Sequence, residues 1–230
     1  MRRGATRGPA TRARGPHARR HAHALAESTG NIEAVTSSFR IRPATSTDIV
    51  DAAETLGLAF ADYPFTRHTV DSRDHLDRVR SLQRLFLTEI GLRCGKVWVA
   101  GDSTAVAVWT TPSSTGLDEA FGDIADQVTD LYGDRAEIAA RAEAATARLR
   151  PTDPVWYLAT VGVAPVSQRR GLGRAVLEPG LKAAKEQGCP AYLETSSPAN
   201  VTFYERLGFE VTGSVRLPDD GPMVWAMLRA

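Results

Sequence analysis

Hydrophobic and polar positions follow two different periods along the chain, which predicts both helices and strands. Apolar residues recur at helical spacing in 45–60 and in 71–89, as they do in amphipathic helices. Thr45 precedes Asp48 by three residues, which resembles a capping box at the start of the first helix. Shorter apolar runs, bounded by glycine or proline, predict the first strands at 39–42, 96–100 and 105–111.

The second half of the chain predicts a parallel crossover followed by antiparallel strands. The run 156–163 is almost continuously apolar, which is typical of a strand covered on both faces, and Gly162 within it indicates a bulge. A helix connects this strand to the next one, which makes a βαβ unit. The elements expected are one broken helix or two in 117–149, strands at 156–163, 191–194, 209–215 and 223–228, and helices at 171–187 and 201–207. We therefore expect an α/β fold, a mixed sheet with helices on both faces.

The composition of the chain is that of an average globular protein, except in its N-terminal segment. Of the 230 residues, 43% are hydrophobic and 24% are charged, and no apolar run approaches the ~20 residues of a membrane-spanning helix. Residues 1–34 hold seven arginines and two glutamates without apolar periodicity, so they bury too little surface to fold. We expect a disordered Arg-rich tail at 1–37, one folded domain at 38–230, and no membrane partner.

Other interpretations of the tail stay open. One interpretation is that the arginines contact nucleic acid, and another is that the three histidines bind metal adventitiously. A third is that the true start of the chain lies near Val35. A twin-arginine signal is disfavoured because no apolar region follows Arg2 and Arg3. Our preferred interpretation gives the tail no function and names no nucleic-acid partner.

The cysteines point to a cytoplasmic protein. Cys94 and Cys189 form no CxxC pair and have no histidine near them in the sequence. Neither a zinc site nor a disulfide framework is indicated. We expect two reduced thiols and no metal.

The segment Gln168–Ala175 is the strongest candidate for chemistry, because it lies between a buried strand and a helix start. Gly171 and Gly173 allow a ligand to approach the backbone, and the first helical N–H groups are unpaired. Three arginines add positive charge: Arg169, Arg170 and Arg174. The combination suits a pyrophosphate, while the alternative is that the glycines only permit a tight turn.

A dinucleotide-binding fold is the rival for this segment. It also places glycines after a strand, with an acidic residue about 20 positions further on, and Glu194 lies near that distance. Val176 stands where the third glycine is needed, and seven residues separate the strand from Gly171. The chain has one such unit, late in the sequence, so this rival is disfavoured.

Two motifs in this region resemble those of the GNAT N-acetyltransferases. Gln168-x-x-Gly171-x-Gly173, after a strand with Val161 and Val163, is similar to the family's acetyl-CoA-binding motif. The segment Asn200–Phe209 resembles the family's second signature, an Asn-led helix that ends in Tyr-x-x-x-Gly-Phe. Within the family, the puromycin N-acetyltransferases are the most similar group. The segments that carry this narrower resemblance are 59–64, 66–71, 95–100, 105–112, 158–163, 193–196 and 203–209.

The resemblance implies a GNAT-type, mostly antiparallel sheet in which strand 156–163 splays from strand 191–194 and takes up acetyl-CoA. It implies direct acetyl transfer to a primary amine, with a backbone N–H at Val161 or beside it polarising the thioester carbonyl. The implied cofactor-binding residues are Val161, Gly162, Val163, Arg169, Arg170, Gly171, Leu172, Gly173, Arg174, Ala175, Asn200 and Tyr204. Asn200 either orients the pantetheine or caps its helix.

The catalytic residues implied are Tyr204 and Glu194. The phenol of Tyr204 is protonated at neutral pH and is able to protonate the leaving thiolate, or it only packs on the cofactor. Glu194 acts as base directly or through water, or is a structural carboxylate. His68 is a further candidate base, or a packing residue.

The acceptor pocket is expected to be aromatic, because puromycin carries a methoxyphenyl group and a dimethyladenine. Its candidate residues are Tyr63, Phe65, His68, Trp109 and Trp156, each of which is equally able to be a core residue. Phe65 stands where the puromycin enzymes have a small residue, which leaves the exact acceptor open.

We expect acetylation of the free α-amino group of puromycin or of a closely related aminonucleoside, which inactivates an antibiotic. The alternative is a GNAT enzyme for another small primary amine. A non-catalytic acetyl-CoA-binding protein, a nucleic-acid binder acting through the tail, and a dinucleotide oxidoreductase are the rivals from other classes. A monomer and a homodimer are both compatible with the sequence.

Overall fold

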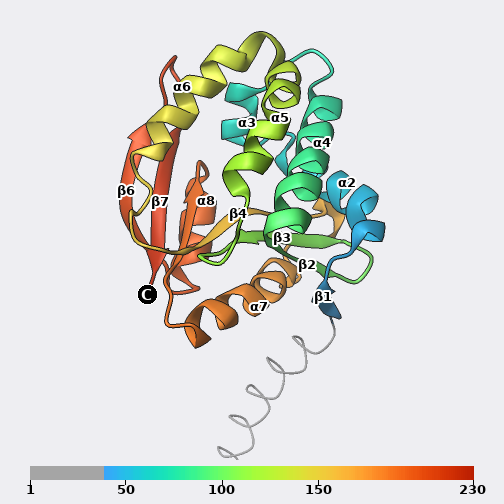
Figure 1. Ribbon diagram of the computed structural model, residues 1–230, viewed down its shortest axis with the longest axis vertical. Coiled ribbons are helices and arrows are strands. Elements are labelled where there is room, and N and C mark those ends of the chain that lie inside the picture. Colours follow the sequence, from blue (N-terminus) through green and yellow to red (C-terminus); the bar gives the residue numbers. More distant parts are fainter. Residues whose placement is uncertain (1–38) are drawn as a thin grey trace, which may run out of the picture. The chain divides into compact units, whose positions relative to one another are not determined.

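The computed structural model describes residues 39–230; the disorder expected for 1–37 lies outside the described residues. Seven strands form one sheet in the order β1-β2-β3-β4-β5-β7-β6 (Figure 1). Only β4 and β5 pair in parallel, and the other neighbours are antiparallel. The strands are β1 (Ile41–Pro43), β2 (Lys96–Ala100), β3 (Ala105–Thr110), β4 (Trp156–Val163), β5 (Ala191–Thr195), β6 (Glu210–Arg216) and β7 (Met223–Arg229). The mixed, mostly antiparallel sheet is the one expected.

Helices cover both faces of this sheet, as the sequence predicts. The helices are α2 (Ile49–Phe60), α3 (Pro64–Thr69), α4 (His75–Phe86), α5 (Leu117–Tyr132), α6 (Ala136–Ala147), α7 (Leu172–Glu186) and α8 (Pro198–Glu205). On one face, α7 and α8 bury a core that includes Trp109, Trp156 and Leu193. On the other face, Leu56 of α2 packs on Val106 and Val108 of β3.

The helix boundaries depart from the prediction at two places, α3 and the start of α8. The segment expected as a loop after the first helix contains α3, which Pro64 opens at its first position, where a missing N–H costs nothing. The region 117–149, expected as one broken helix or two, is two helices, α5 and α6, separated at Gly133, which has φ +60°. The last helix, α8, begins at Pro198 rather than 201.

The expected capping box is present. The backbone N–H and the hydroxyl of Thr45 both donate to Asp48 Oδ2, over 2.8 and 3.1 Å. The guanidinium of Arg42 donates to both carboxylate oxygens of Asp48, over 2.7 and 2.6 Å. This bidentate pair joins β1 to the start of α2 and holds the pKa of Asp48 well below its usual range.

The expectation of a bulge at Gly162 is wrong. Gly162 pairs regularly with Val106, whereas the register between β3 and β4 shifts where Val108 faces Thr160 and Trp109 faces Leu158, so Ala159 is the extra residue. A Cβ at Gly162 would lie 2.9 Å from Leu56 Cδ2 and 3.1 Å from Ala59 Cβ. Gly162 therefore allows α2 to pack closely on β4.

Candidate active site

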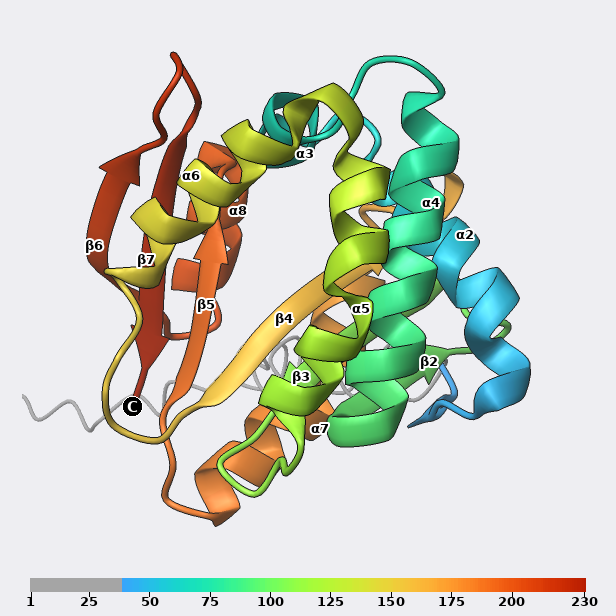
Figure 2. The ribbon, with the colours of Figure 1, turned by 45° about the horizontal axis from the view of Figure 1, so that its top comes forward.

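The centre of the candidate site is the divergence of β4 and β5. Only two residue pairs join these strands, Trp156 with Ala191 and Tyr157 with Tyr192. Beyond them the strands separate, as Figure 2 shows, so that one edge of β4 from about Leu158 to Val163 has no strand partner within the described chain. Backbone groups on such an edge are available to an extended ligand.

The N-terminus of α7 opens beside the end of this edge. Gln168 Nε2 donates to the Val163 carbonyl over 3.2 Å, which ties the loop to β4. Gly171 has φ +87°, and a Cβ there would meet nothing within 4 Å. This glycine is needed for the backbone conformation and leaves the space before the helix empty of side chains.

Positive charge surrounds this helix N-terminus. Arg169, Arg170 and Arg174 are exposed, and none of them takes part in an ion pair with another residue of 39–230. The first-turn N–H groups and the helix dipole add to this potential. A diphosphate at this position is therefore well matched by the residues present.

One buried hydroxyl lies at the same strand. Thr160 Oγ1, next to the bulge in β4, is buried and has no hydrogen-bond partner among residues 39–230. A buried polar group without a partner is costly. Together with the open strand edge and the open helix N-terminus, it indicates a site built for a polar, extended ligand that carries a diphosphate, as acetyl-CoA does.

Tyr204 lies in α8 within the core under α7 and is 5% exposed. The rings of Phe203 and Phe209 lie 5.1 and 5.7 Å from its ring centre. Burial raises the pKa of the Tyr204 phenol well above its ordinary value, so the hydroxyl carries its proton at neutral pH. This hydroxyl has no hydrogen bond to another residue of the described domain.

Glu194 lies on β5, two residues beyond the last pair with β4, and its side chain is 12% exposed. Oε1 of Glu194 accepts hydrogen bonds from Arg150 Nε, over 3.1 Å, and from the Tyr192 hydroxyl, over 3.0 Å. Burial raises the pKa of Glu194, and the positive charge of Arg150 opposes that rise. A carboxylate with a raised pKa is well suited to accept a proton.

Tyr63 and Phe65, two of the residues expected at the acceptor, contact the end of β5. The Tyr63 hydroxyl accepts the backbone N–H of Ser196 over 2.6 Å and is hydrogen-bonded to Thr195 Oγ1 over 2.9 Å. The backbone N–H of Phe65 donates to Ser196 Oγ over 3.0 Å. The loop between α2 and α3 is thereby fixed to the end of β5, at the mouth of the strand divergence.

The other acceptor candidates lie elsewhere. Trp109 is 0% exposed, and Trp156, also buried, donates its indole N–H to Gln187 Oε1 over 2.9 Å. Both lie in the core under α7, so they are not walls of an open pocket. His68 Nε2 donates to the Pro218 carbonyl over 3.0 Å, which ties α3 to the β6–β7 hairpin and occupies that nitrogen.

Asn200 does not cap its helix. The residue at the cap position of α8 is Ser197, and Asn200 lies in the first turn, its backbone N–H bonded to the Ser197 carbonyl over 3.0 Å. Of the two roles expected for Asn200, capping is therefore excluded by the register of the helix. Orientation of the pantetheine by Asn200 stays a prediction.

Three residues of the site were not predicted from sequence: Arg150, Tyr157 and Tyr192. Arg150 lies between α6 and β4 and contacts Glu194 across 44 residues of sequence, and its guanidinium carbon is 5.6 Å from the centre of the Tyr157 ring. The Tyr157 and Tyr192 rings are 5.6 Å apart. Alternation along the two strands places both tyrosines on the face of Glu194, a pattern that the sequence carries.

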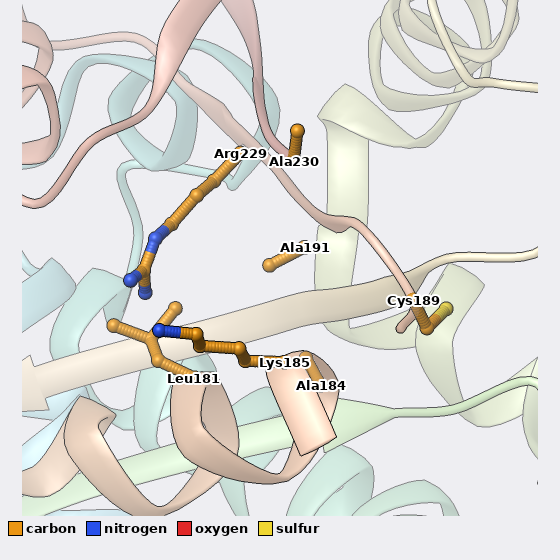
Figure 3. A pocket seen from close by; sticks show the side chains of 7 residues that line it. All are labelled: Leu181, Ala184, Lys185, Cys189, Ala191, Arg229 and Ala230. Carbon is orange, nitrogen blue, oxygen red and sulfur yellow. The ribbon is translucent and has the colours of Figure 1, made fainter. Parts of the chain in front are cut away.

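A shallow depression of about 150 Å³ lies at the other end of α7 (Figure 3). Lys185 and Arg229 extend toward its opening, with Cys189 at its rim. It lies beside the last turns of α7, not beside the open N-terminus, and it is too small for a coenzyme. No cluster of three or more metal-binding side chains exists within 39–230, and none of the helices in this part of the chain is long and apolar enough to cross a membrane.

Comparison with known proteins agrees with this geometry. Residues 110–209 match the model of the acetyltransferase (GNAT) family. An uncharacterized N-acetyltransferase of Schizosaccharomyces pombe is 38% identical over 72 residues, which is 31% of this chain and 29% of that protein. The match thus spans less than a third of the length of this curated relative.

Solved structures extend the likeness over the whole described domain. A protein of Corynebacterium glutamicum, described as histone acetyltransferase HPA2 and related acetyltransferase, is 28% identical with a TM-score of 0.65, over 83% of this chain and 95% of that one. Arylalkylamine N-acetyltransferase 2 of Aedes aegypti, at 13% identity, has a TM-score of 0.54 over 84% and 98% of the two chains, and shows the fold alone. The protein has the GNAT fold. Residues 110–209 within it are similar to the acetyltransferase (GNAT) family.

Proposed function

We propose that the protein transfers an acetyl group from acetyl-CoA to the free α-amino group of puromycin or of a closely related aminonucleoside, in the cytoplasm, and so inactivates the antibiotic. One observation carries the proposal. Two segments of the narrower resemblance, 59–64 and 193–196, lie outside the cofactor loop. They meet at the mouth of the strand divergence, where the Tyr63 hydroxyl is hydrogen-bonded to the Ser196 N–H and to Thr195 Oγ1.

The chain offers a group for each requirement of the reaction. Acetyl-CoA supplies an activated acyl thioester, and the residues that would hold it are the loop 169–175, the open edge of β4 at Val161 and Val163, and Asn200 with Tyr204. A backbone N–H at Val161 or beside it would stabilise the charge that develops on the carbonyl oxygen. Tyr204, protonated and buried, would give its proton to the departing sulfur.

The reaction needs only a weak base to deprotonate the acceptor amine. An α-amino group has a pKa near 7.7–8.0, so part of it is already neutral at physiological pH. Glu194 accepts the proton that the amine loses, directly or through a water molecule. Its position two residues past the last pair of β4 and β5, where the two strands separate, supports this role.

A second candidate, acetylation of another small primary amine, is favoured by Phe65. Its ring packs with Ala142 of α6 and with Leu217 and Val224 of the β6–β7 hairpin. A bulkier side chain at a position where the puromycin enzymes have a small residue would leave less room for the acceptor. An acceptor smaller than puromycin would fit such a site.

The test is incubation of the purified protein with acetyl-CoA and puromycin, following thiol release and the mass of the product. We expect one added acetyl group on the amine. Tyr204→Phe should lower kcat by about 10²-fold or more, as loss of a general acid does. Thiol release only with other amines would replace puromycin by the second candidate. No release with any amine, despite acetyl-CoA binding, would overturn the catalytic proposal.

A further inference from the structure

The two carboxylate oxygens of Glu194 have different surroundings. Both hydrogen bonds, from Arg150 Nε and from the Tyr192 hydroxyl, go to Oε1. Oε2 has no partner within residues 39–230, and it is not among the fully buried unpartnered atoms of this region. Oε1 of Glu194 is therefore held by two donors, whereas Oε2 keeps some exposure and has no partner in this part of the chain.

The arginine that holds Glu194 is shared with a second carboxylate. Arg150 Nη1 lies 2.7 Å from Glu143 Oε1 of α6, while Arg150 Nε donates to Glu194. The guanidinium also lies over the Tyr157 ring. Arg150 is thus fixed from three sides and links α6 to the end of β5.

We propose that Arg150 is a positioning residue for the acetyl transfer: it fixes Glu194 through Oε1, so that Oε2 alone points to the acceptor amine. Glu143 competes with Glu194 for the positive charge of Arg150, because both carboxylates pair with the same guanidinium. This inference rests on the proposed function, because it assigns Glu194 the role of proton acceptor. The charged and titratable groups that face Glu194 are Arg150 and Glu143 from the α6 side, Tyr157 from β4 and Tyr192 from β5.

Substitutions of Arg150 and of Glu143 should move the pKa of Glu194 in opposite directions. Removing Arg150 takes away the cation that lowers the pKa of Glu194, so that pKa rises. Removing the charge of Glu143 takes away a repulsion that raises the same pKa, so it falls. Because Glu194 acts in its ionised form, the acidic limb of the pH–kcat profile should move to higher pH in the first variant and to lower pH in the second.

The experiment compares Arg150→Met, Glu143→Gln, Arg150→Lys and the control Arg148→Met, whose exposed arginine lies two residues away and is in no ion pair within the described domain. The readouts are the pH–kcat profile of thiol release and the ¹³C chemical-shift titration of the Glu194 carboxyl in labelled protein. We expect shifts of about one pH unit upward in Arg150→Met and smaller downward shifts in Glu143→Gln. Arg150→Lys, which keeps the charge, should restore most of the profile, and Arg148→Met should leave it in place.

The outcomes separate the inference from the function. If Arg150→Met unfolds, Tyr192→Phe replaces it, since that variant also removes a bond to Oε1 and should raise the pKa of Glu194. Equal profiles and equal titrations in all variants, or shifts of the same sign in Arg150→Met and Glu143→Gln, would overturn the positioning role. If no amine is acetylated, the proposed function fails, while the titration still reports whether Arg150 and Glu143 control Glu194.

Discussion

The phenol oxygen of Tyr63 lies 2.6 Å from the backbone nitrogen of Ser196, across 133 residues of sequence. Ser196 is 4% exposed, so its N–H has no ready replacement from solvent. Tyr63→Phe would leave this donor unpaired, and we expect it to lower the free energy of unfolding by about 1–3 kcal/mol. Urea denaturation measures the loss. We also expect a higher KM for the acceptor, because the loop would be less firmly held at the mouth of the site.

The matched control for this bond is Thr195→Val. It removes the other partner of the Tyr63 hydroxyl but keeps the Ser196 bond. We expect a smaller loss than in Tyr63→Phe. A Tyr63→Phe protein as stable as wild type, or less affected than Thr195→Val, would contradict the importance given to the Ser196 contact.

The sequence predicts what is encoded locally. The apolar run of β4, the glycines before α7 and the Asn-led signature together predict the strand, the helix and the cofactor end of the site. α3 was missed because Pro64–Thr69 is only six residues long and carries too few apolar positions to show a period. Trp109 and Trp156 were assigned to the acceptor because periodicity gives the face of a strand but not which helices cover that face.

Contacts between residues that are far apart in the chain could not be predicted from the sequence either. Arg150 meets Glu194 only because α6 returns to the start of β4, and no spacing along the chain encodes that contact. Gly162 was assigned to a bulge because a glycine in a strand has two common causes, a bulge and a close backbone approach. The choice between them depended on where α2 packs.

Gly180 gives a direct test of packing between α7 and the sheet. A Cβ at this position would lie 2.5 Å from atoms of the Trp109 indole, which is fully buried. Gly180→Ala should therefore destabilise the protein by about 1–3 kcal/mol through overpacking, despite the better helix propensity of alanine. Thermal or urea unfolding measures the effect.

Gly122 is the control for that substitution. It also lies inside a helix, α5, but a Cβ there would meet nothing within 4 Å. Gly122→Ala should stabilise the protein by about 0.5–1 kcal/mol, the propensity gain alone. If both alanines stabilise the protein, the close contact between Gly180 and Trp109 does not exist in solution.

The arginines before and within the first turn of α7 should determine acetyl-CoA affinity. Arg169, Arg170 and Arg174 are exposed, so their substitution by glutamine should leave stability within about 0.5 kcal/mol. We expect the triple variant to bind acetyl-CoA at least about tenfold more weakly, which is ~1.4 kcal/mol, and to lose most of the salt dependence of binding. Calorimetric titration at two salt concentrations measures both.

The control for the loss of positive charge from α7 is Lys182→Gln, on the exposed side of the same helix. Lys182 pairs only with Glu186 in the same helix and lies more than two turns from Gly171. Its loss should leave the Kd of acetyl-CoA unchanged. A triple variant with unchanged affinity and unchanged salt dependence would place the diphosphate somewhere other than the start of α7.

The pair between Arg42 and Asp48 should make stability depend on pH in the acidic range. The folded state lowers the pKa of Asp48 from its ordinary value, first through the bond from Arg42, so its contribution is complete above about pH 4 and is lost as the pH falls further. Asp48→Asn, which removes the titrating group, should be less stable than wild type at pH 7. The difference between the two proteins should narrow progressively below pH 4, because only the wild type gives up a charged partner of Arg42 there.

Asp126→Asn, at an exposed position of α5 in no ion pair within 39–230, should show no such convergence. A gap between Asp48→Asn and wild type that stays constant from pH 7 to pH 3 would mean that Asp48 stabilises the fold through its shape and its capping bonds to Thr45, and not through its charge.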